Sequence, residues 1–164
     1  MADSTDKKHW VFRVGLADRA GALTSIASTF SNRGISIDTV VGHGAAYGAT
    51  HDGTVVVTFW CTEAEKDEIV RVVERLSKVT TLEEHAYDSQ SLRKSALLHT
   101  KRRLTPRDVA GRETFLTCEL TKEDKEAGLY TYFVAGPPNE FDPIVTRFAE
   151  EGILKDVVYS VVGL

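Results

Sequence analysis

The feature that most constrains the fold is a switch between two hydrophobic periods in the first half of the chain. Apolar residues alternate from Trp10 to Leu16, which predicts a strand. They then recur at the i, i+3, i+4 and i+7 spacing of a helix, at Leu23, Ile26, Ala27 and Phe30. Up to about residue 87 the predicted order is β-α-β-β-α-β, the split βαβ arrangement. We therefore expect a four-stranded antiparallel sheet with both helices on one face.

A capping box marks the start of the second predicted helix. Thr62 begins the sequence T-E-A-E, so that Glu65 stands three residues later. In this motif each of the two side chains accepts a hydrogen bond from a free backbone N–H of the first turn. Acidic residues in the first turns and basic residues toward the end also suit the helix dipole.

The second half of the chain repeats this order less completely. Strands are predicted at 96–99, 113–120, 129–135 and 153–162, with a helix near 140–151. Thr105-Pro106 can start a helix of only one or two turns before Gly111. The predicted fold class is α+β with two ferredoxin-like βαββαβ units. We place these units at 9–88 and 96–164, joined by a linker at 89–95, and expect the first helix of the second unit to be shortened.

The composition argues against several classes of protein. A net charge of −4 gives no electrostatic reason to expect nucleic acid as a partner. Cys61 and Cys118 are too few for a disulfide scaffold and fit a reducing compartment. The N-terminus has no apolar signal region, and no apolar run approaches the roughly 18 residues of a membrane span. We therefore expect a cytoplasmic protein without a nucleic-acid or membrane partner.

The turn over 17–21 is the strongest candidate for a binding site. It leads directly into a helix, whose first backbone N–H groups lack intrahelical acceptors and lie at the positive end of the dipole. Gly21 lets a ligand such as a carboxylate approach the backbone closely, because it has no Cβ. Asp18 can accept a hydrogen bond from an ammonium group, and Ser36 can contribute a hydroxyl. The alternative is that Asp18 only stabilises the turn or caps the helix.

Other residue groups give weaker signals. His43 and His51 lie in a Gly-rich loop over 42–53 without a local Cys or paired carboxylate, which is a poor set of metal ligands. Asp38, Asp52 and His51 can be combined into an acid–base site on paper, as residues can in almost any protein. The chain contains no nucleophile-elbow, P-loop, HExxH or dinucleotide-binding motif. We predict no catalytic residue, no bound metal and no cofactor.

Residues 91–112 form a basic segment in a chain that is negative overall. The segment has seven basic residues against one acidic residue, Asp108. The basic residues are Arg93, Lys94, Lys101, Arg102, Arg103, Arg107 and Arg112. A solvated linker surface is the plain interpretation, and a docking surface for an acidic patch on a partner protein is the sharper one. RNA is disfavoured because the G-F-x-F context of ferredoxin-like RNA binders is absent.

Two stretches of the sequence resemble a known family. The run DRAGAL at 18–23, followed by FSNRGISI at 30–37, resembles the signature of ACT domains, which are ferredoxin-like modules that sense amino acids. The C-terminal half adds LYT at 129–131, AG at 135–136, Phe141 and SVVGL at 160–164. Together the stretches are similar to the regulatory (small) subunit of acetolactate synthase, and the resemblance covers most of the chain.

The resemblance implies a non-catalytic, allosteric regulatory subunit of branched-chain amino acid biosynthesis. Such a subunit binds a small amino-acid effector such as valine, and it modulates the catalytic subunit of acetolactate synthase. The resemblance also implies a homodimer through the N-terminal unit, with each effector site built from two chains. The implied effector-binding residues are Asp18, Ala20, Gly21, Ala22, Leu23, Ser36 and Ile37.

Two of these positions differ from the family pattern. The pattern has Asn where this chain has Asp18, and Asn again where it has Ser36. Both positions belong to the effector site that the resemblance implies. The differences favour an alternative, in which the chain is a stand-alone ACT-type sensor of another small molecule and regulates a different enzyme or a transcription factor.

Overall fold

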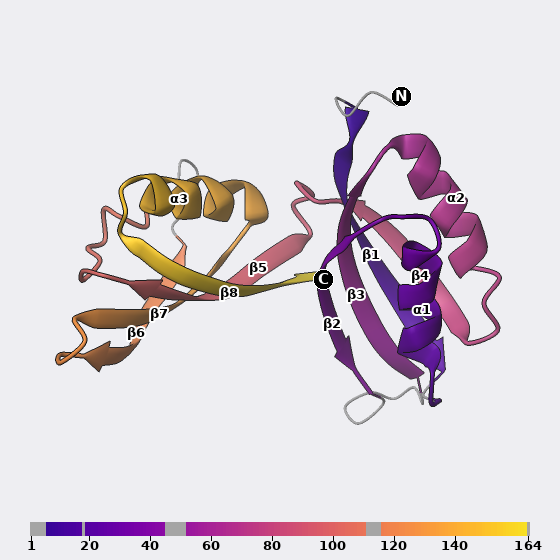
Figure 1. Ribbon diagram of the computed structural model, residues 1–164, viewed down its shortest axis with the longest axis horizontal. Coiled ribbons are helices and arrows are strands. Elements are labelled where there is room, and N and C mark those ends of the chain that lie inside the picture. The colour runs from indigo at the N-terminus through magenta and orange to yellow at the C-terminus, as the bar shows by residue number, and fades with distance from the viewer. Residues whose placement is uncertain (1–5, 18, 45–51, 111–115, 164) are drawn as a thin grey trace. The chain divides into compact units, whose positions relative to one another are not determined.

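The computed structural model describes residues 6–17, 19–44, 52–110 and 116–163, which form two compact units, 1–89 and 90–164. The first unit contains β1 (Lys8–Ala17), α1 (Ala22–Ser31), β2 (Ile37–His43), β3 (Asp52–Cys61), α2 (Glu63–Val73) and β4 (Val79–Ala86). The second contains β5 (Leu92–Thr100), β6 (Thr117–Asp124), β7 (Leu129–Gly136), α3 (Pro138–Glu150) and β8 (Leu154–Gly163). Figure 1 shows the helices of each unit on one face of its sheet.

Both sheets have four strands in the order of a ferredoxin-like unit. The first sheet is β2-β3-β1-β4 and the second is β6-β7-β5-β8, with antiparallel neighbours throughout. The predicted α+β fold of two ferredoxin-like units is therefore confirmed. None of the helices in the described part of the chain is long and apolar enough to cross a membrane.

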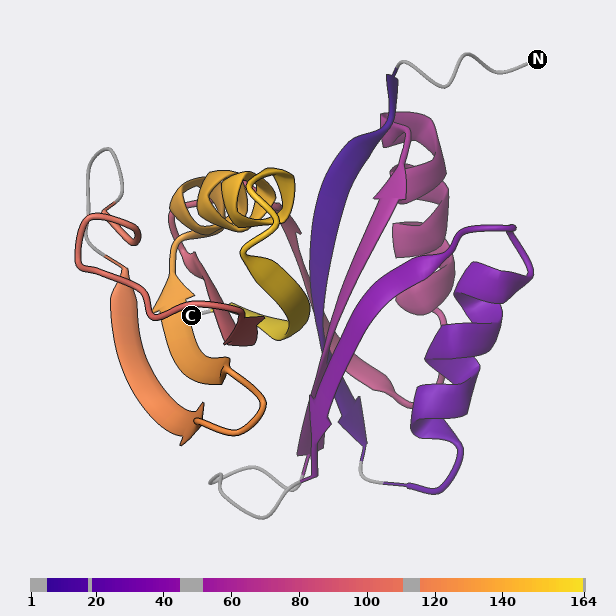
Figure 2. The same cartoon turned by 60° about the vertical axis from the view of Figure 1, so that its left-hand side comes forward.

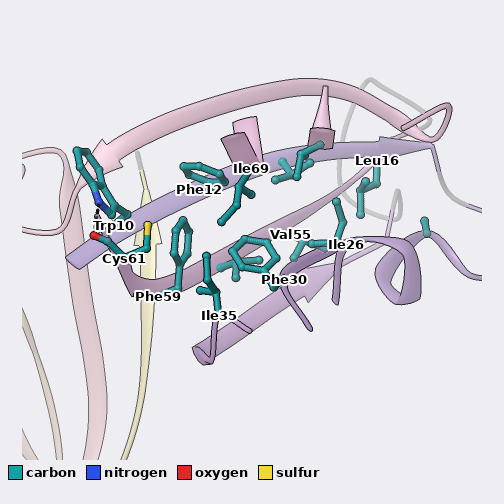
Figure 3. Close-up of a cluster of buried hydrophobic side chains, with 14 residues drawn as sticks. Trp10, Phe12, Leu16, Ile26, Phe30, Ile35, Val55, Phe59, Cys61 and Ile69 are labelled. Atoms are coloured by element: carbon teal, nitrogen blue, oxygen red, sulfur yellow. Dashed lines mark hydrogen bonds between the residues drawn. The ribbon is translucent and has the colours of Figure 1, made fainter. Parts of the chain in front are cut away.

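Three phenylalanines form the centre of the first core, between the sheet and its two helices (Figure 3). Phe12 of β1, Phe59 of β3 and Phe30 of α1 are all fully buried. Phe59 meets the other two rings edge-on, with centroids 4.8 Å from Phe12 and 4.7 Å from Phe30. This geometry suits the ring quadrupoles and stabilises the core beyond simple area burial. The rings fix α1 against the middle of the sheet.

The buried face of α1 differs from the predicted one. The helix buries Ala22, Ile26, Thr29 and Phe30, whereas the spacing in the sequence predicted Leu23 and Ala27 in place of Ala22 and Thr29. Leu23 is 48% exposed. The helix is therefore turned so that its first leucine lies outside the core, beside the pocket described below.

The start of α2 agrees with the capping box predicted from the sequence. The backbone N–H of Glu65 donates to the Thr62 hydroxyl at 3.3 Å, and the N–H of Thr62 donates to the Glu65 carboxylate at 2.8 Å. The hydrogen bonds that the Glu65 carboxylate accepts from the backbone N–H and the hydroxyl of Thr62 hold the pKa of Glu65 below its usual value. The predicted capping box is confirmed. It could be predicted because both residues lie within four positions of the sequence.

The second unit departs from the prediction at both ends of its first strand. β5 begins at Leu92 rather than at Ala96, so most of the predicted linker at 89–95 belongs to the sheet. After β5, the described residues form a turn over 105–109 instead of the predicted short helix. α3 is consequently the only helix in the described part of this unit (Figure 1).

Asp108 holds this turn together. Its carboxylate accepts two hydrogen bonds from the Arg102 guanidinium, at 3.0 and 2.8 Å, and two more from the Thr105 backbone N–H and hydroxyl, at 2.6 and 2.8 Å. Arg147 of α3 donates to the backbone carbonyl of Asp108. The Arg102 guanidinium holds the pKa of Asp108 well below its usual range, because the hydrogen bonds favour the charged form. Hydrogen bonds to the Asp108 carboxylate therefore hold this segment in a turn, where the sequence predicted a short helix.

Replacing Phe59 by Leu should destabilise the first unit by about 1 to 2 kcal/mol, because it removes both edge-on contacts and leaves a cavity. Both tryptophans, Trp10 and Trp60, lie in this unit, so urea unfolding followed by tryptophan fluorescence reports on it specifically. Glu68→Ala is the control, since Glu68 is exposed on α2 and does not line the pocket described below. It should change the free energy of unfolding by less than about 0.5 kcal/mol. Equal losses in the two variants would contradict the assigned core.

Asp108→Asn should cost about 1 to 2 kcal/mol of local stability around residues 105–109, because it removes the charge from a multiply hydrogen-bonded carboxylate. Since the pKa of Asp108 is lower in the folded chain than its ordinary 3.8, the charged group stabilises the turn above that pH. This stabilisation is lost as the pH falls below it. Hydrogen exchange of the Thr105 and Asp108 amides, which are hydrogen-bonded within the turn, should show this pH dependence in the parent chain after correction for intrinsic rates. The same dependence in Asp108→Asn would contradict the assignment.

Candidate functional site

A pocket of about 390 Å³ opens in the first unit where β1 passes into α1. One side is formed by the β1–α1 connection and the first turn of α1, including Arg19, Gly21 and Leu23. The other side is formed by the end of β2 and the start of β3, including Val40 and His43. The turn that the sequence analysis singled out therefore lies at a concave surface.

The first turn of α1 presents backbone N–H groups to this pocket that no described side chain caps. Gly21 is the N-cap and has a left-handed backbone with φ 78°, which favours glycine. No side chain caps the helix among the described residues, and its first turn contains no acidic residue. The N–H of Ala22 bonds to the Arg19 carbonyl, and the helix ladder begins with the N–H of Ser25 bonded to the Gly21 carbonyl. The N–H groups between them, at Leu23 and Thr24, lie at the positive end of the dipole and can receive an anion.

Lys78 lies in the connection between α2 and β4 and holds the β1–α1 turn through two hydrogen bonds. Its ammonium group donates to the Ala20 carbonyl at 3.0 Å, and its own carbonyl accepts from the N–H of Ala17 at 2.8 Å. A Cβ added at Gly21 would lie 3.2 Å from the same ammonium group. Lys78 thus positions the β1–α1 turn and adds positive charge next to the start of the helix.

The pocket combines a positive end with an apolar wall. Arg19 is its charged lining residue, and no acidic residue lines it in the described part of the chain. The wall includes the aliphatic side chains of Leu16, Leu23, Val40 and Val55. A carboxylate at the start of α1 and an aliphatic group against this wall fit such an arrangement.

The implied effector residues fall into two groups. Gly21, Ala22 and Leu23 line the pocket, and Ala20 lies next to it with its carbonyl bonded to Lys78. Ser36 and Ile37 lie beyond the other end of α1, which at 10 residues is about 15 Å long. Ser36 is exposed, whereas Ile37 packs against the core. Asp18 lies outside the described residues. A single chain therefore brings together only the first group.

The alternative sites suggested by the sequence are not assembled by the described residues. His43 lines the pocket, while His51 lies outside the described part, and no group of three metal-ligating side chains occurs among the described residues. Asp38 and Asp52 stand at opposite ends of the β2–β3 hairpin, and Asp38 instead lies 3.0 Å from His9. Burial raises the pKa of the Cys61 thiol to about 12, so this cysteine is not a reactive thiolate at neutral pH.

Lys78 and Val40 are site residues that the sequence analysis missed. Lys78 is 58 residues from Ala20, and Val40 reaches the pocket only because β2 runs antiparallel to β3. Lys78 lies five residues after Val73, the last apolar residue of α2, and this spacing points to the pocket only when the sheet order is already known. Arg19 belongs to the predicted turn at 17–21, but the sequence analysis gave it no role in binding.

Comparisons with known proteins relate the chain to others through its fold. No family model matches the sequence, and no curated protein matches it significantly. The small subunit of acetolactate synthase from Thermotoga maritima has a similar structure, with a TM-score of 0.69 and 11% identity over 96% of each chain. This chain has an ACT-like fold. The regulatory subunit of aspartate kinase from Thermus thermophilus matches 87% of this chain and 91% of its own, with 13% identity and a TM-score of 0.47.

Proposed function

We propose that this chain is a non-catalytic regulatory subunit that binds a small amino-acid effector and modulates the catalytic subunit of acetolactate synthase. The effector is a branched-chain amino acid such as valine, and the protein acts in the cytoplasm as a homodimer. The observation that carries the proposal is the start of α1 at Gly21, which no side chain of the described residues caps and which lies at a pocket with a positive end and an aliphatic wall. The two-unit fold and the family signature at 18–23 and 30–37 support the same function.

The pocket chemistry supports an aliphatic amino acid over a sugar or nucleotide. The effector's carboxylate would bond to the N–H groups of Leu23 and Thr24, next to the guanidinium of Arg19. Its side chain would lie against Leu16 and Val55. In this proposal Asp18 accepts the ammonium group, as the resemblance implies. Binding can regulate only if it differs between two states of the assembly.

A second copy of the chain would complete the site. Leu23 and Val40 line the pocket and are 48% and 44% exposed, although both are large aliphatic residues. Aliphatic surface at the mouth of a pocket is stabilised when a partner covers it. Since Ser36 lies at the far end of α1 from Gly21, it would reach an effector site only on the neighbouring chain. The exposed aliphatic side chains at the mouth of the pocket therefore support a dimer through the first unit.

Gly21→Asp should weaken binding of valine, leucine or isoleucine at least about tenfold, because it puts a negative charge where the carboxylate binds. Gly128→Asp is the matched control: its φ of 61° resembles the 78° of Gly21, and no atom lies near the added Cβ. It should bind the effector with unchanged affinity. Isothermal titration measures both affinities, and thermal unfolding with and without ligand checks them independently. If the two variants bound alike, the site assignment would be wrong.

Leu23→Asp should shift the protein from dimer to monomer, because it places a charge in the surface that the second copy covers. Leu97→Asp provides the comparison, since Leu97 is 41% exposed but lies in the second unit. We expect that variant to remain dimeric. Sedimentation velocity over a range of concentrations measures both. A dimer that survives Leu23→Asp but is lost in Leu97→Asp would place the interface in the second unit.

The stand-alone sensor remains the second candidate because of Asp18 and Ser36, which differ from the family pattern. The two functions differ in their partner and not in their pocket. Reconstitution with the acetolactate synthase catalytic subunit of the same organism distinguishes them. Effector-dependent change of its activity supports the regulatory subunit. Effector binding without any change of that activity supports the sensor.

A further inference from the structure

Four of the seven exposed large hydrophobic residues in the described part of the chain lie on one face of the second sheet. They are Leu97 of β5, Phe133 of β7, and Val158 and Val162 of β8, with exposed fractions from 36% to 61%. Their strand neighbours, such as Leu98 and Val134, belong to the buried core, so side-chain alternation places the four on the opposite face. They define an open face of this sheet, on the side away from α3 (Figure 1).

Three of these side chains form a row across the strands. Leu97 pairs with Phe133 on one side and with Val158 on the other. Side chains paired in this way have Cβ atoms about 5 Å apart, so the row is a continuous apolar strip. A shallow hollow of about 220 Å³ lies along it, lined also by Ser95 and Ser160. Contiguous exposed apolar surface of this kind is typical of an interaction site.

The polar side chains around the row are hydrogen-bonded to one another. The hydroxyls of Ser95 and Ser160 share a hydrogen bond at 3.0 Å, and the side chains of His99 and Thr131 share another at 3.1 Å. A buried polar group is costly mainly when it has no partner. An apolar surface can therefore cover this face without leaving these four side chains unpaired.

The charged groups of the open face lie at its margins. Arg93 donates to backbone carbonyls at the start of β5, and the Asp156 carboxylate accepts from the backbone N–H of Val157 at 2.8 Å. Because β8 is an edge strand, this second bond also occupies a donor that a strand added at the edge would use. The uncharged middle of the face does not select a charged partner and does not repel a second copy of itself.

The row is also complementary in shape to its own copy, since it has a large side chain at one end and a small one at the other. A two-fold axis over Leu97 and parallel to the strands places Phe133 of one copy over Val158 of the other. Side chains of sheets stacked in this way, about 10 Å apart, interdigitate. Glu119 of β6 would lie beyond the partner's edge strand, so its charge would stay in solvent.

We propose that the open face of the second sheet packs on the same face of a second copy of this chain, across a two-fold axis over Leu97. The three overlapping strands are at least eight residues long, which gives a contact of about 400 Å² on each copy. The total of about 800 Å² is smaller than a standard interface, so we expect a weak contact with a Kd of about 100 μM. It does not involve the effector pocket, and it adds to the proposed dimer of the first unit.

Sedimentation equilibrium of the full chain with Leu23→Asp tests this contact by itself, because that substitution removes the proposed dimer of the first unit. The chain should be a monomer at about 10 μM and should approach the mass of a dimer at about 500 μM. Phe133→Glu and Val158→Lys, each added separately, should abolish this rise in mass. Glu126→Lys, which reverses an exposed charge in the turn between β6 and β7, should leave it unchanged.

An equimolar mixture of the Phe133→Glu and Val158→Lys chains tests the two-fold axis. In the mixed pair the new glutamate faces the new lysine at one end of the row, and the native Phe133 faces the native Val158 at the other. The mixture should therefore associate although neither variant does alone, which also shows that both are folded. A mixture that stays monomeric, or a Leu23→Asp chain whose mass is constant up to about 500 μM, would overturn the proposal.

The same measurement on the chain without Leu23→Asp separates this contact from the proposed dimer of the first unit. If both chains show one identical monomer–dimer curve that Phe133→Glu abolishes, the open face is the contact and the dimer of the first unit is contradicted. If the chain without Leu23→Asp is a dimer at every concentration and Phe133→Glu changes nothing, the open face is not a contact.

Discussion

The pairing of β1 between β3 and β4 is the constraint on which the first unit depends. β1 forms antiparallel ladders on both sides, from Lys8 opposite Cys61 to Ala17 opposite Asp52 and from Trp10 opposite Ala86 to Leu16 opposite Val79. Because β1 is central, three connections meet at its end: the turn into α1, the end of the β2–β3 hairpin and the segment with Lys78. Figure 2 shows α1 and α2 on the same face of this sheet. The pocket is a consequence of this topology, since strand order alone brings Gly21, Val40 and Lys78 together.

Local signals in the sequence were sufficient for much of the fold and for half of the site. The capping box of Thr62 and Glu65 spans three residues, and Gly21 marks a turn into a helix, so both could be predicted without a structure. The role of Lys78 could not, because its contact with Ala20 crosses 58 residues. The exposure of Leu23 was missed for another reason: helical spacing gives the apolar stripe but not which edge of it faces a pocket.

The second unit has the same sheet order as the first but a different local structure after its first strand. The described chain after β5 folds around Asp108 into a turn and not into a helix. The basic segment, which composition presents as one surface, is divided by the fold. Lys94 and Arg102 form internal ion pairs, whereas Arg103 and Arg107 are exposed.

The most direct test of the effector site is a titration of the ¹⁵N-labelled chain with valine, leucine and isoleucine, followed by amide chemical shifts. If the start of α1 binds the carboxylate, the N–H resonances of Leu23 and Thr24 should show the largest downfield shifts, together with changes at Val40 and His43 across the pocket. Saturation with one of these amino acids while Leu23 and Thr24 remain unshifted, or largest changes within residues 90–164, would contradict the account.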